Sequence, residues 1–304
     1  MQLYIHFLGT GGSWPTVQRN VAAIAIKRGG ETILFDCGEG TQRQFQRSKL
    51  SYMQISKIFI THFHGDHFLG LPGFIQTLQL NDREEPLHIY GPKGIKSIVE
   101  TITKLGYFRP SYPVYAYEVK AGDVLSFDGY KIKVAEACHN VPALAYALEE
   151  DVRPGKFNKE KALSLGIPEG PLFRKLQNGE AIEINGKIIT PDMVLGKPRP
   201  GRKITITGDT MPCESIIKLA ARSDVLIHDA TFDSSMEDKA KEYGHSTAKQ
   251  AAMVAKQAGV EKLLLTHISP RYKNAKLLEE EAKEIFPNSY VAHDFMEIEV
   301  KLKK

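Results

Sequence analysis

Short apolar runs bounded by turn residues alternate along the chain with stretches whose apolar residues recur every three or four positions. The runs are typical of β-strands and the recurring pattern is typical of amphipathic helices. Strands are predicted at 1–9, 21–27, 32–36, 57–61, 87–90, 113–119, 124–127, 130–136, 203–208, 224–228, 262–266, 289–292 and 295–302. Helices are predicted at 40–47, 68–79, 92–105, 212–222, 246–258 and 275–285.

This order of elements gives two strand-rich halves, each closed by helices. It fits two sheets packed face to face with helices outside, and it equally fits one doubly wound α/β sheet. Periodicity alone does not distinguish these two folds. The length of 304 residues is compatible with a single domain.

Composition places the chain among ordinary globular proteins, with 25% charged and 42% hydrophobic residues. No apolar run approaches the roughly 20 residues that cross a bilayer, and the amino terminus lacks the pattern of a signal peptide. We therefore expect a cytoplasmic protein without a membrane segment. The three cysteines Cys37, Cys138 and Cys213 are widely spaced and odd in number, which argues against a disulfide framework and favours buried thiols.

A Gly- and Pro-rich segment at 150–203 carries the basic excess of the chain. Residues 151–203 contain 11 Lys and Arg against 6 Asp and Glu, whereas the rest of the chain is nearly balanced at 29 against 30. Frequent glycine and proline resist long regular elements. We therefore interpret this segment as a flexible arm inserted into the main domain, 1–304, although a plain solvated loop would have the same composition.

Metal-capable side chains gather in the sequence THFHGDH, directly after an apolar run. His62, His64, Asp66 and His67 lie where a predicted strand gives way to a turn, so their side chains can converge above the sheet edge. Imidazole and carboxylate ligands suit zinc, iron or manganese, and the absence of thiolates disfavours a purely structural zinc site.

Three further candidates each end an apolar run. They are His139, Asp209 and His267. If these strand ends meet at one rim, the site has seven ligands, which is too many for one zinc but fits two metals roughly 3.5–4 Å apart bridged by a hydroxide. For Asp209, a turn-capping role is the structural alternative.

Together these residues resemble the metallo-β-lactamase superfamily over essentially the whole chain. Within it, FLGTGGSWP, DCGEGTQRQ, LIHDATF, GHST and the basic insertion resemble the ribonuclease Z family, which removes 3′ trailers from precursor tRNA. The resemblance implies a four-layer αβ/βα sandwich and two Zn²⁺ per subunit, with Mn²⁺ or Fe²⁺ as alternatives. It implies that His62, His64 and His139 hold the first ion. Asp66, His67 and His267 would hold the second, and Asp209 would bridge.

The resemblance also implies three catalytic residues. Asp66 would orient the attacking water, and His245 in GHST would protonate the departing 3′ oxygen. Asp229 would fix the tautomer of His245 and raise its pKa. Relatives often carry Glu at position 229, so the shorter Asp is expected to lengthen or reposition that bond. Alternatively, His245 only neighbours the cap of the helix that follows.

The loop Pro15–Asn20 departs from the PxKxRN pattern of the family, because Val17 replaces the lysine. An aliphatic side chain makes no contact to a phosphate or base edge. This departure leaves open whether CCA-bearing tRNA is rejected and where cleavage falls. Arg19 and Asn20 are candidate contacts to the RNA 3′ end, or they only close the turn into the next strand.

The resemblance assigns the arm as an exosite that grips folded tRNA, and it implies a homodimer in which one subunit presents substrate to the other. Clustered basic residues attract phosphates without reading sequence. The candidate contacts are Lys156, Lys159, Lys161, Arg174, Lys175 and Arg199.

Three classes of function remain in competition. The first is a metal-dependent tRNA 3′ endonuclease, and the second is a small-molecule phosphodiesterase or arylsulfatase of the same fold. The third is a non-catalytic RNA-binding module, which the complete ligand set disfavours.

Overall fold

The computed structural model describes residues 1–303 and contains two seven-stranded sheets. The first sheet has its strands in the order β16 (Glu297–Glu299), β1 (Leu3–Gly9), β2 (Ala23–Arg28), β3 (Glu31–Phe35), β4 (Ile55–Phe59), β5 (Leu87–Gly91) and β6 (Val114–Glu118). The second has the order β15 (Ser289–Val291), β14 (Leu263–Thr266), β13 (Val225–Asp229), β12 (Lys203–Ile206), β9 (Ala143–Glu150), β8 (Tyr130–Ala137) and β7 (Val124–Phe127). Strands β3 to β6 run parallel, as do β12 to β15.

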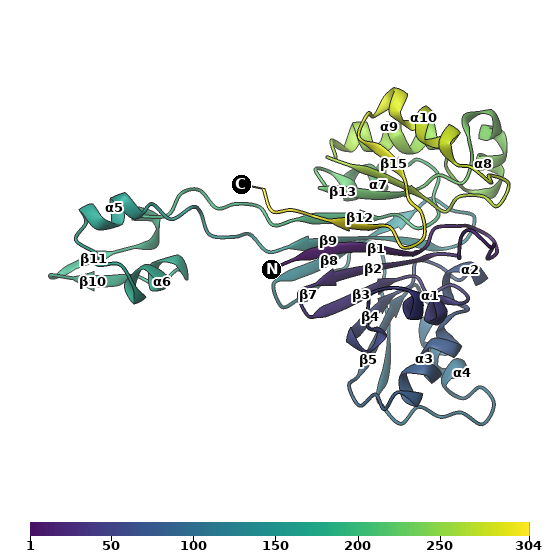
Figure 1. Cartoon of the computed structure of the whole chain (residues 1–304), viewed down its shortest axis with the longest axis horizontal. Coiled ribbons are helices and arrows are strands. Elements are labelled where there is room, and N and C mark those ends of the chain that lie inside the picture. Colours follow the sequence, from purple (N-terminus) through teal and green to yellow (C-terminus); the bar gives the residue numbers. More distant parts are fainter. Residues whose placement is uncertain (304) are drawn as a thin grey trace. The chain divides into compact units, whose positions relative to one another are not determined.

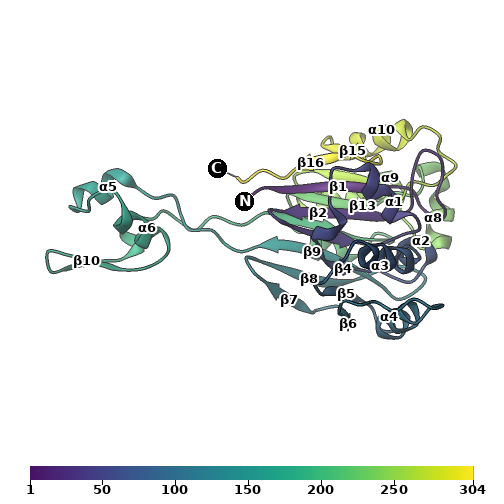
Figure 2. The same ribbon diagram turned by 60° about the horizontal axis from the view of Figure 1, so that its bottom comes forward.

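Helices cover the outer face of each sheet, which gives the four-layer αβ/βα sandwich (Figure 1). One apolar core joins the first sheet to α1 (Thr41–Arg47), α3 (Leu71–Leu80) and α4 (Ile95–Thr103), which come to the front in Figure 2. Another joins the second sheet to α7 (Glu214–Ala220), α9 (Ala248–Ala258) and α10 (Lys276–Ile285). The two sheets rule out the alternative of a single doubly wound sheet.

Aromatic rings fill the space between the two sheets. Phe35 and Phe59 of the first sheet pack against Tyr146 of β9, with ring centroids 6.0 and 5.3 Å apart. The Tyr146 hydroxyl donates a 2.7 Å hydrogen bond to the carbonyl of Ile60, at the start of the histidine-rich loop. Contacts between the sheets therefore fix the backbone from which the candidate ligands project.

Several elements differ from the sequence prediction. The helix expected at 68–79 is divided into α2 (Gly65–Phe68) and α3. Gly70 separates them where the chain passes so near to Gly38 that a Cβ would lie 2.1 Å from the Gly38 carbonyl oxygen. Strand β9 was not predicted, because its sequence ALAYALEE is rich in helix-favouring residues. The short polar helix α8 (Glu237–Tyr243), which buries only Ala240, was missed as well.

Residues 128–130 and 149–201 form a second compact unit. It contains α5 (Lys159–Ser164), α6 (Pro171–Gln177) and the hairpin of β10 (Ile182–Ile184) and β11 (Lys187–Ile189). Its regular elements are short, as its glycine and proline content predicts. It nevertheless buries an apolar cluster of its own: Ala162, Ile167, Leu176, Ile182, Ile189 and Val194.

Three short 3₁₀ turns complete the secondary structure, at Tyr52–Gln54, Pro191–Met193 and Ser234–Met236. Within residues 1–303, no helix combines the length and the apolar character that crossing a membrane requires.

Candidate metal centre

The candidate ligands lie at the carboxyl ends of strands from both sheets. The loop Thr61–His67 follows β4 of the first sheet, whereas the other ligands follow β8, β12 and β14 of the second: His139, Asp209 and His267. In open α/β sheets, ligands bind beyond the carboxyl ends of the strands. The structure therefore brings all seven sequence-predicted ligands to one rim.

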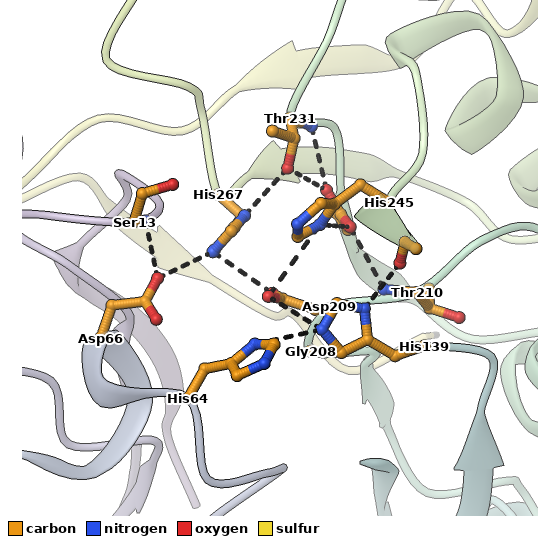
Figure 3. Close-up of polar contacts among 12 residues, drawn as sticks. Ser13, His64, Asp66, His139, Gly208, Asp209, Thr210, Thr231, His245 and His267 are labelled. Carbon is orange, nitrogen blue, oxygen red and sulfur yellow. Dashed lines mark hydrogen bonds and ion pairs between the residues drawn. The ribbon is translucent and has the colours of Figure 1, made fainter. Parts of the chain in front are cut away.

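The first group of ligand atoms belongs to His62, His64, His139 and Asp209, which lie within 4.8 Å of one another. The Nε2 atom of His139 lies 3.2 Å from Nδ1 of His64 (Figure 3). His62 is fully buried, whereas His64 is exposed. The group therefore has a closed inner side and a side open to solvent.

The second group contains Asp66, His67 and His267, again within 4.8 Å of one another. The Oδ2 atom of Asp66 lies 3.2 Å from Nε2 of His267 and 3.7 Å from Nε2 of His67. A backbone N–H also points at Asp66, because Ser13 donates a 2.7 Å hydrogen bond to the same oxygen.

Asp209 lies between the two groups and presents one oxygen to each. Its Oδ1 is 3.3 Å from Nε2 of His67 and 3.4 Å from Nε2 of His267. Its Oδ2 is 3.5 Å from Nε2 of His62 and 4.0 Å from Nε2 of His139. The close approach of the preceding turn fixes this carboxylate, because Gly208 has φ +60° and a Cβ there would lie 2.8 Å from Thr61.

These residues fit divalent cations. The buried atoms His62 Nε2, His67 Nε2 and Asp209 Oδ1 all point into the cluster, yet they have no hydrogen-bond partner within residues 1–303. Buried polar atoms are rarely left without a partner in native proteins. Burial raises the pKa of Asp209, but His267 and His67 lower it well below its usual value. The carboxylate is therefore ionised, as metal binding requires.

Asp36, which was not selected from the sequence, orients two of the candidate ligands. Its Oδ2 lies 2.7 Å from Nδ1 of His67 and accepts a 2.9 Å hydrogen bond from the hydroxyl of Thr61. Because that hydroxyl donates to Asp36, its oxygen is left to accept from Nδ1 of His62, 3.0 Å away. Both imidazoles then turn Nε2 toward the cluster.

Asp229 and Thr231 repeat this arrangement on the second sheet. Asp229 Oδ2 lies 2.8 Å from Nδ1 of His245, and its Oδ1 accepts a 2.7 Å hydrogen bond from the Thr231 hydroxyl. The Thr231 oxygen lies 2.9 Å from Nδ1 of His267. Each buried carboxylate therefore orients one histidine directly and a second one through a threonine. The family resemblance predicted Asp229, whereas the local signal for Asp36 is that it follows an apolar strand.

Backbone groups complete the support of the cluster. The carbonyl of Gly244 lies 2.7 Å from Nδ1 of His139. Gly12 runs so close to His267 that a Cβ would lie 2.4 Å from its ring. Asp36 and His267 have φ angles of 57° and 59°. Non-glycine residues rarely adopt this left-handed conformation, and where they do, they are often at functional sites.

His245 lies beside the cluster, and its side chain is mostly buried. Burial lowers its pKa, but Asp229 and Asp209 raise it to about 9. The expected lengthening of the Asp229 bond is wrong, because the 2.8 Å separation is an ordinary hydrogen-bond length. The capping alternative is compatible with this contact, since Thr247 and Gln250 form the capping box of α9 while His245 points to Asp229.

The residues of the loop at 15–20 differ in how far they are held by contacts with the rest of the protein. The Arg19 guanidinium donates 2.6 Å hydrogen bonds to the Thr10 hydroxyl and the Ala292 carbonyl. The backbone of Asn20 bonds to Asp294 and Gly11. These contacts favour the turn-closing interpretation of Arg19 and Asn20, whereas Val17 is fully exposed.

Most of the basic residues predicted to contact RNA lie on the surface of the second unit. Lys156, Lys159 and Lys161 line a common cavity of about 460 Å³, and Lys159 also pairs with Glu169. Arg174 and Lys175 are exposed in the last turn of α6. Arg199 instead donates a 3.2 Å hydrogen bond to the carbonyl of Pro154.

The sequence predicted three buried thiols, and this prediction is wrong for two of them. Cys37 is buried, but Cys138 and Cys213 are partly exposed. The Cys213 thiol lies 3.1 Å from the Ser215 hydroxyl.

Two helix-covered sheets with a histidine and aspartate cluster at their shared rim define a metallo-β-lactamase-type hydrolase with a divalent metal centre. Family models agree, because residues 192–268 match the beta-lactamase superfamily domain and residues 3–105 match the anti-Pycsar protein Apyc1.

Relatives over the whole chain define the family more narrowly. The chain is 50% identical to ribonuclease Z of Methanosarcina acetivorans and 48% identical to that of Methanosarcina mazei, in both cases over 98% of each chain. The crystal structure of the short form of human tRNase Z is 29% identical and superposes with a TM-score of 0.71, over 97% of this chain and 98% of that one. The chain belongs to the ribonuclease Z family. This membership confirms the resemblance drawn from the sequence and makes the chain a ribonuclease.

Proposed function

We propose that this protein removes the 3′ trailer from precursor tRNA by hydrolysing one phosphodiester bond. One observation carries the proposal: in a chain of the ribonuclease Z family, seven metal-capable side chains converge at one rim with His245 beside them. Water adds to phosphorus and the bond from phosphorus to the 3′ oxygen breaks. The tRNA keeps a 3′-hydroxyl, and the trailer keeps the phosphate.

The seven side chains are proposed to hold two ions. His62, His64 and His139 would hold one, and Asp66, His67 and His267 the other. Asp209 would be shared, since it presents one oxygen to each group. Zn²⁺ suits this nitrogen and oxygen set, and Mn²⁺ or Fe²⁺ are also compatible. When bound, such ions lower the pKa of water and neutralise charge on the phosphate.

Asp66 is proposed to orient the attacking water. Its carboxylate is only partly enclosed, and Ser13 holds one of its oxygens from the backbone. Burial raises the pKa of Asp66, but the hydrogen bond and charge of His267 and the charge of His67 lower it well below the usual range. The carboxylate is thus ionised at neutral pH and accepts a hydrogen bond from water.

His245 is proposed to donate the proton that the 3′ oxygen takes up. Its Nδ1 is held by Asp229, which leaves Nε2 to face the substrate. A pKa near 9 keeps the ring protonated at neutral pH. An alkoxide leaving group is strongly basic, so an acid at this point raises the cleavage rate by the usual roughly 10²- to 10⁴-fold.

The basic arm is proposed to grip the folded part of the tRNA. Its support is the exposed lysines around the cavity at 156–161 and the exposed Arg174 and Lys175. A homodimer in which one subunit's arm serves the other's metal centre follows from the family resemblance and stays a prediction. The cytoplasmic location, which the sequence pattern predicts, stays a prediction as well.

Cleavage of a trailer-bearing precursor tRNA tests the function. The full-length protein is compared with a K156Q/K159Q/K161Q variant, on the precursor and on a small phosphodiester. The proposal expects the variant to lose RNA cleavage, to depend less on salt and to keep small-ester hydrolysis. Equal RNA cleavage by both proteins would contradict the exosite role. Hydrolysis of the small ester with an untouched precursor would favour the small-molecule alternative.

A further inference from the structure

A small cavity of about 120 Å³ opens beside the metal centre and has no part in the chemistry proposed above. Three segments line it: Phe63 and His64 of the histidine-rich loop, Pro92 and Lys93 before α4, and Val141 and Pro142 before β9. An apolar cavity of roughly 150 Å³ holds one benzene ring. This cavity therefore fits one ring-shaped group and not a whole nucleotide.

Backbone hydrogen bonds join the three walls of the cavity. The Leu144 N–H donates a 2.9 Å hydrogen bond to the Thr61 carbonyl, which ties the segment before β9 to the histidine-rich loop. The Ile60 N–H donates a 2.8 Å hydrogen bond to the carbonyl of Tyr90, which ties that loop to the end of β5. The cavity is thus built into the same hydrogen-bonded rim that carries the candidate metal ligands.

The aromatic ring of Phe63 forms one wall. It packs edge-to-face on Phe68, with ring centroids 5.9 Å apart, and it is partly buried. The backbone of Gly94 lies so near that a Cβ there would be 3.5 Å from the Phe63 ring. The rest of the lining is valine and proline, apart from a histidine and a lysine. An aromatic ring held in place in this way is a platform on which an unpaired base stacks.

Lys93 gives the cavity wall a positive charge. Its side chain is exposed, and among residues 1–303 it has no ion-pair partner. The turn that carries it is held in place, because the Gly94 N–H donates a 2.9 Å hydrogen bond to the Glu118 side chain. Within the described part of the chain, no carboxylate lines the cavity. An apolar recess with one cation suits a nucleotide, since the faces of a base are apolar and its phosphate is an anion.

The place of the cavity in the metal centre indicates which nucleotide it receives. The ring of His139 lies 5.0 Å from that of His64 and 5.1 Å from that of His245, measured between centroids (Figure 3). Val141, in the cavity wall, is two residues after His139. His245 is the proposed acid for the departing 3′ oxygen, whereas Asp66, which orients the water, acts from the opposite side of phosphorus in an in-line displacement. The nucleoside that carries the 3′ oxygen is therefore the one nearest to the cavity.

We propose that this cavity receives the base of the last nucleotide of the tRNA part, the nucleotide whose 3′ oxygen leaves. The base stacks on Phe63, and Lys93 contacts the phosphate on the 5′ side of that nucleotide. The inference rests on the proposed function. Stacking between apolar walls reads no base edge, so the cavity accepts any base. It requires only that the base is unpaired, which places the cut beyond the last base pair of the tRNA.

Kinetics with matched changes in protein and RNA test the proposal. V141F fills the cavity with a ring, whereas the control V124F adds the same ring at an exposed valine of β7 outside it. Each protein cleaves the intact precursor and one that is abasic at the last tRNA nucleotide. In the wild type and V124F, we expect loss of the base to lower kcat/KM by roughly 5- to 150-fold. V141F should cleave the intact precursor as slowly as the wild type cleaves the abasic one, and loss of the base should cost V141F nothing further.

A second variant tests the cavity without changing its volume. K93Q replaces an exposed side chain, so it leaves the core intact. It should weaken binding of both precursors by an equal factor and reduce the slope of the salt dependence by about 1, because one phosphate contact is lost. An unchanged slope would overturn the contact between Lys93 and the phosphate.

Inhibition by small molecules measures the base contact apart from the rest of the tRNA. A nucleoside 5′-monophosphate and ribose 5-phosphate are compared as inhibitors of the hydrolysis of a small phosphodiester. The nucleotide should inhibit the wild type at a concentration roughly 5- to 150-fold lower than the sugar phosphate. V141F should lose this preference while its metal content stays that of the wild type.

The outcomes separate the cavity from the proposed function. Equal cleavage of the intact and abasic precursors by the wild type would overturn the cavity while leaving tRNA cleavage intact. Equal inhibition of the wild type by the nucleotide and the sugar phosphate would do the same. A wild-type protein that prefers the nucleotide as inhibitor but cleaves no precursor would instead overturn the proposed function.

Discussion

Replacing Asp36 with asparagine should weaken metal binding although Asp36 is not a proposed ligand. The buried carboxylate accepts hydrogen bonds from Thr61 N (2.8 Å) and Thr61 Oγ1 (2.9 Å), and His67 Nδ1 lies 2.7 Å away. An asparagine amide can still accept one N–H, but its NH₂ group faces two other donors. His67 loses its partner, and Thr61 no longer fixes His62.

The expected magnitude follows from this count. Loss of one outer hydrogen-bond partner typically costs 10- to 100-fold in metal affinity, or about 1.4–2.8 kcal/mol. Asp36 orients one histidine in each group, so D36N should lower the affinity for both ions by roughly that factor. The metal-free protein should also lose about 1–3 kcal/mol of unfolding free energy, because buried donors are left without acceptors.

Competition against a chromophoric chelator measures both affinities, and urea unfolding of the metal-free protein measures the stability. D229N is the matched control on the second sheet, since Asp229 supports one ligand, His267, through Thr231. D36N should lower the affinity for two ions, whereas D229N should lower the affinity for one. Two ions bound by D36N with wild-type affinity would refute the assignment of Asp36 as the residue that orients both groups.

Three further predictions concern the catalytic side chains. H64A removes one of three imidazoles from the first group, so metal analysis should show a lost ion, and precursor cleavage should fall below detection. H245A should lower the cleavage rate by roughly 10²- to 10⁴-fold with unchanged metal content, whereas a lost ion would show that His245 is a ligand. D229N removes the carboxylate that raises the pKa of His245 to about 9. Because the protonated ring is the acid and is lost as pH rises through its pKa, the alkaline fall in rate should move to lower pH, and an unmoved profile would exclude His245 as the acid.

The convergence of the metal-capable side chains could be predicted from the sequence because these residues lie at the ends of strands. His139, Asp209 and His267 each follow a short apolar run, and parallel strands bring such ends to one edge. Most strands and helices could be predicted from the spacing of their apolar residues. Strand β9 was not, because a central strand buried on both faces shows no alternation, and its alanines and leucines favour a helix locally.

The contacts that support the candidate ligands could not be predicted from the sequence, because they join residues far apart in the chain. Asp36 and Thr61 lie 25 positions apart, and nothing local indicates that one carboxylate serves both His62 and His67. The same holds for Arg19, whose sequence context suggests an RNA contact while its guanidinium bonds to Thr10 and to a carbonyl 273 positions away.

Anomalous diffraction from crystals of the metal-loaded protein would test the dinuclear centre most directly. We predict two peaks roughly 3.5–4 Å apart, one against His62, His64 and His139 and the other against Asp66, His67 and His267, with Asp209 between them. A single peak, or a peak between Asp229 and His245, would contradict it.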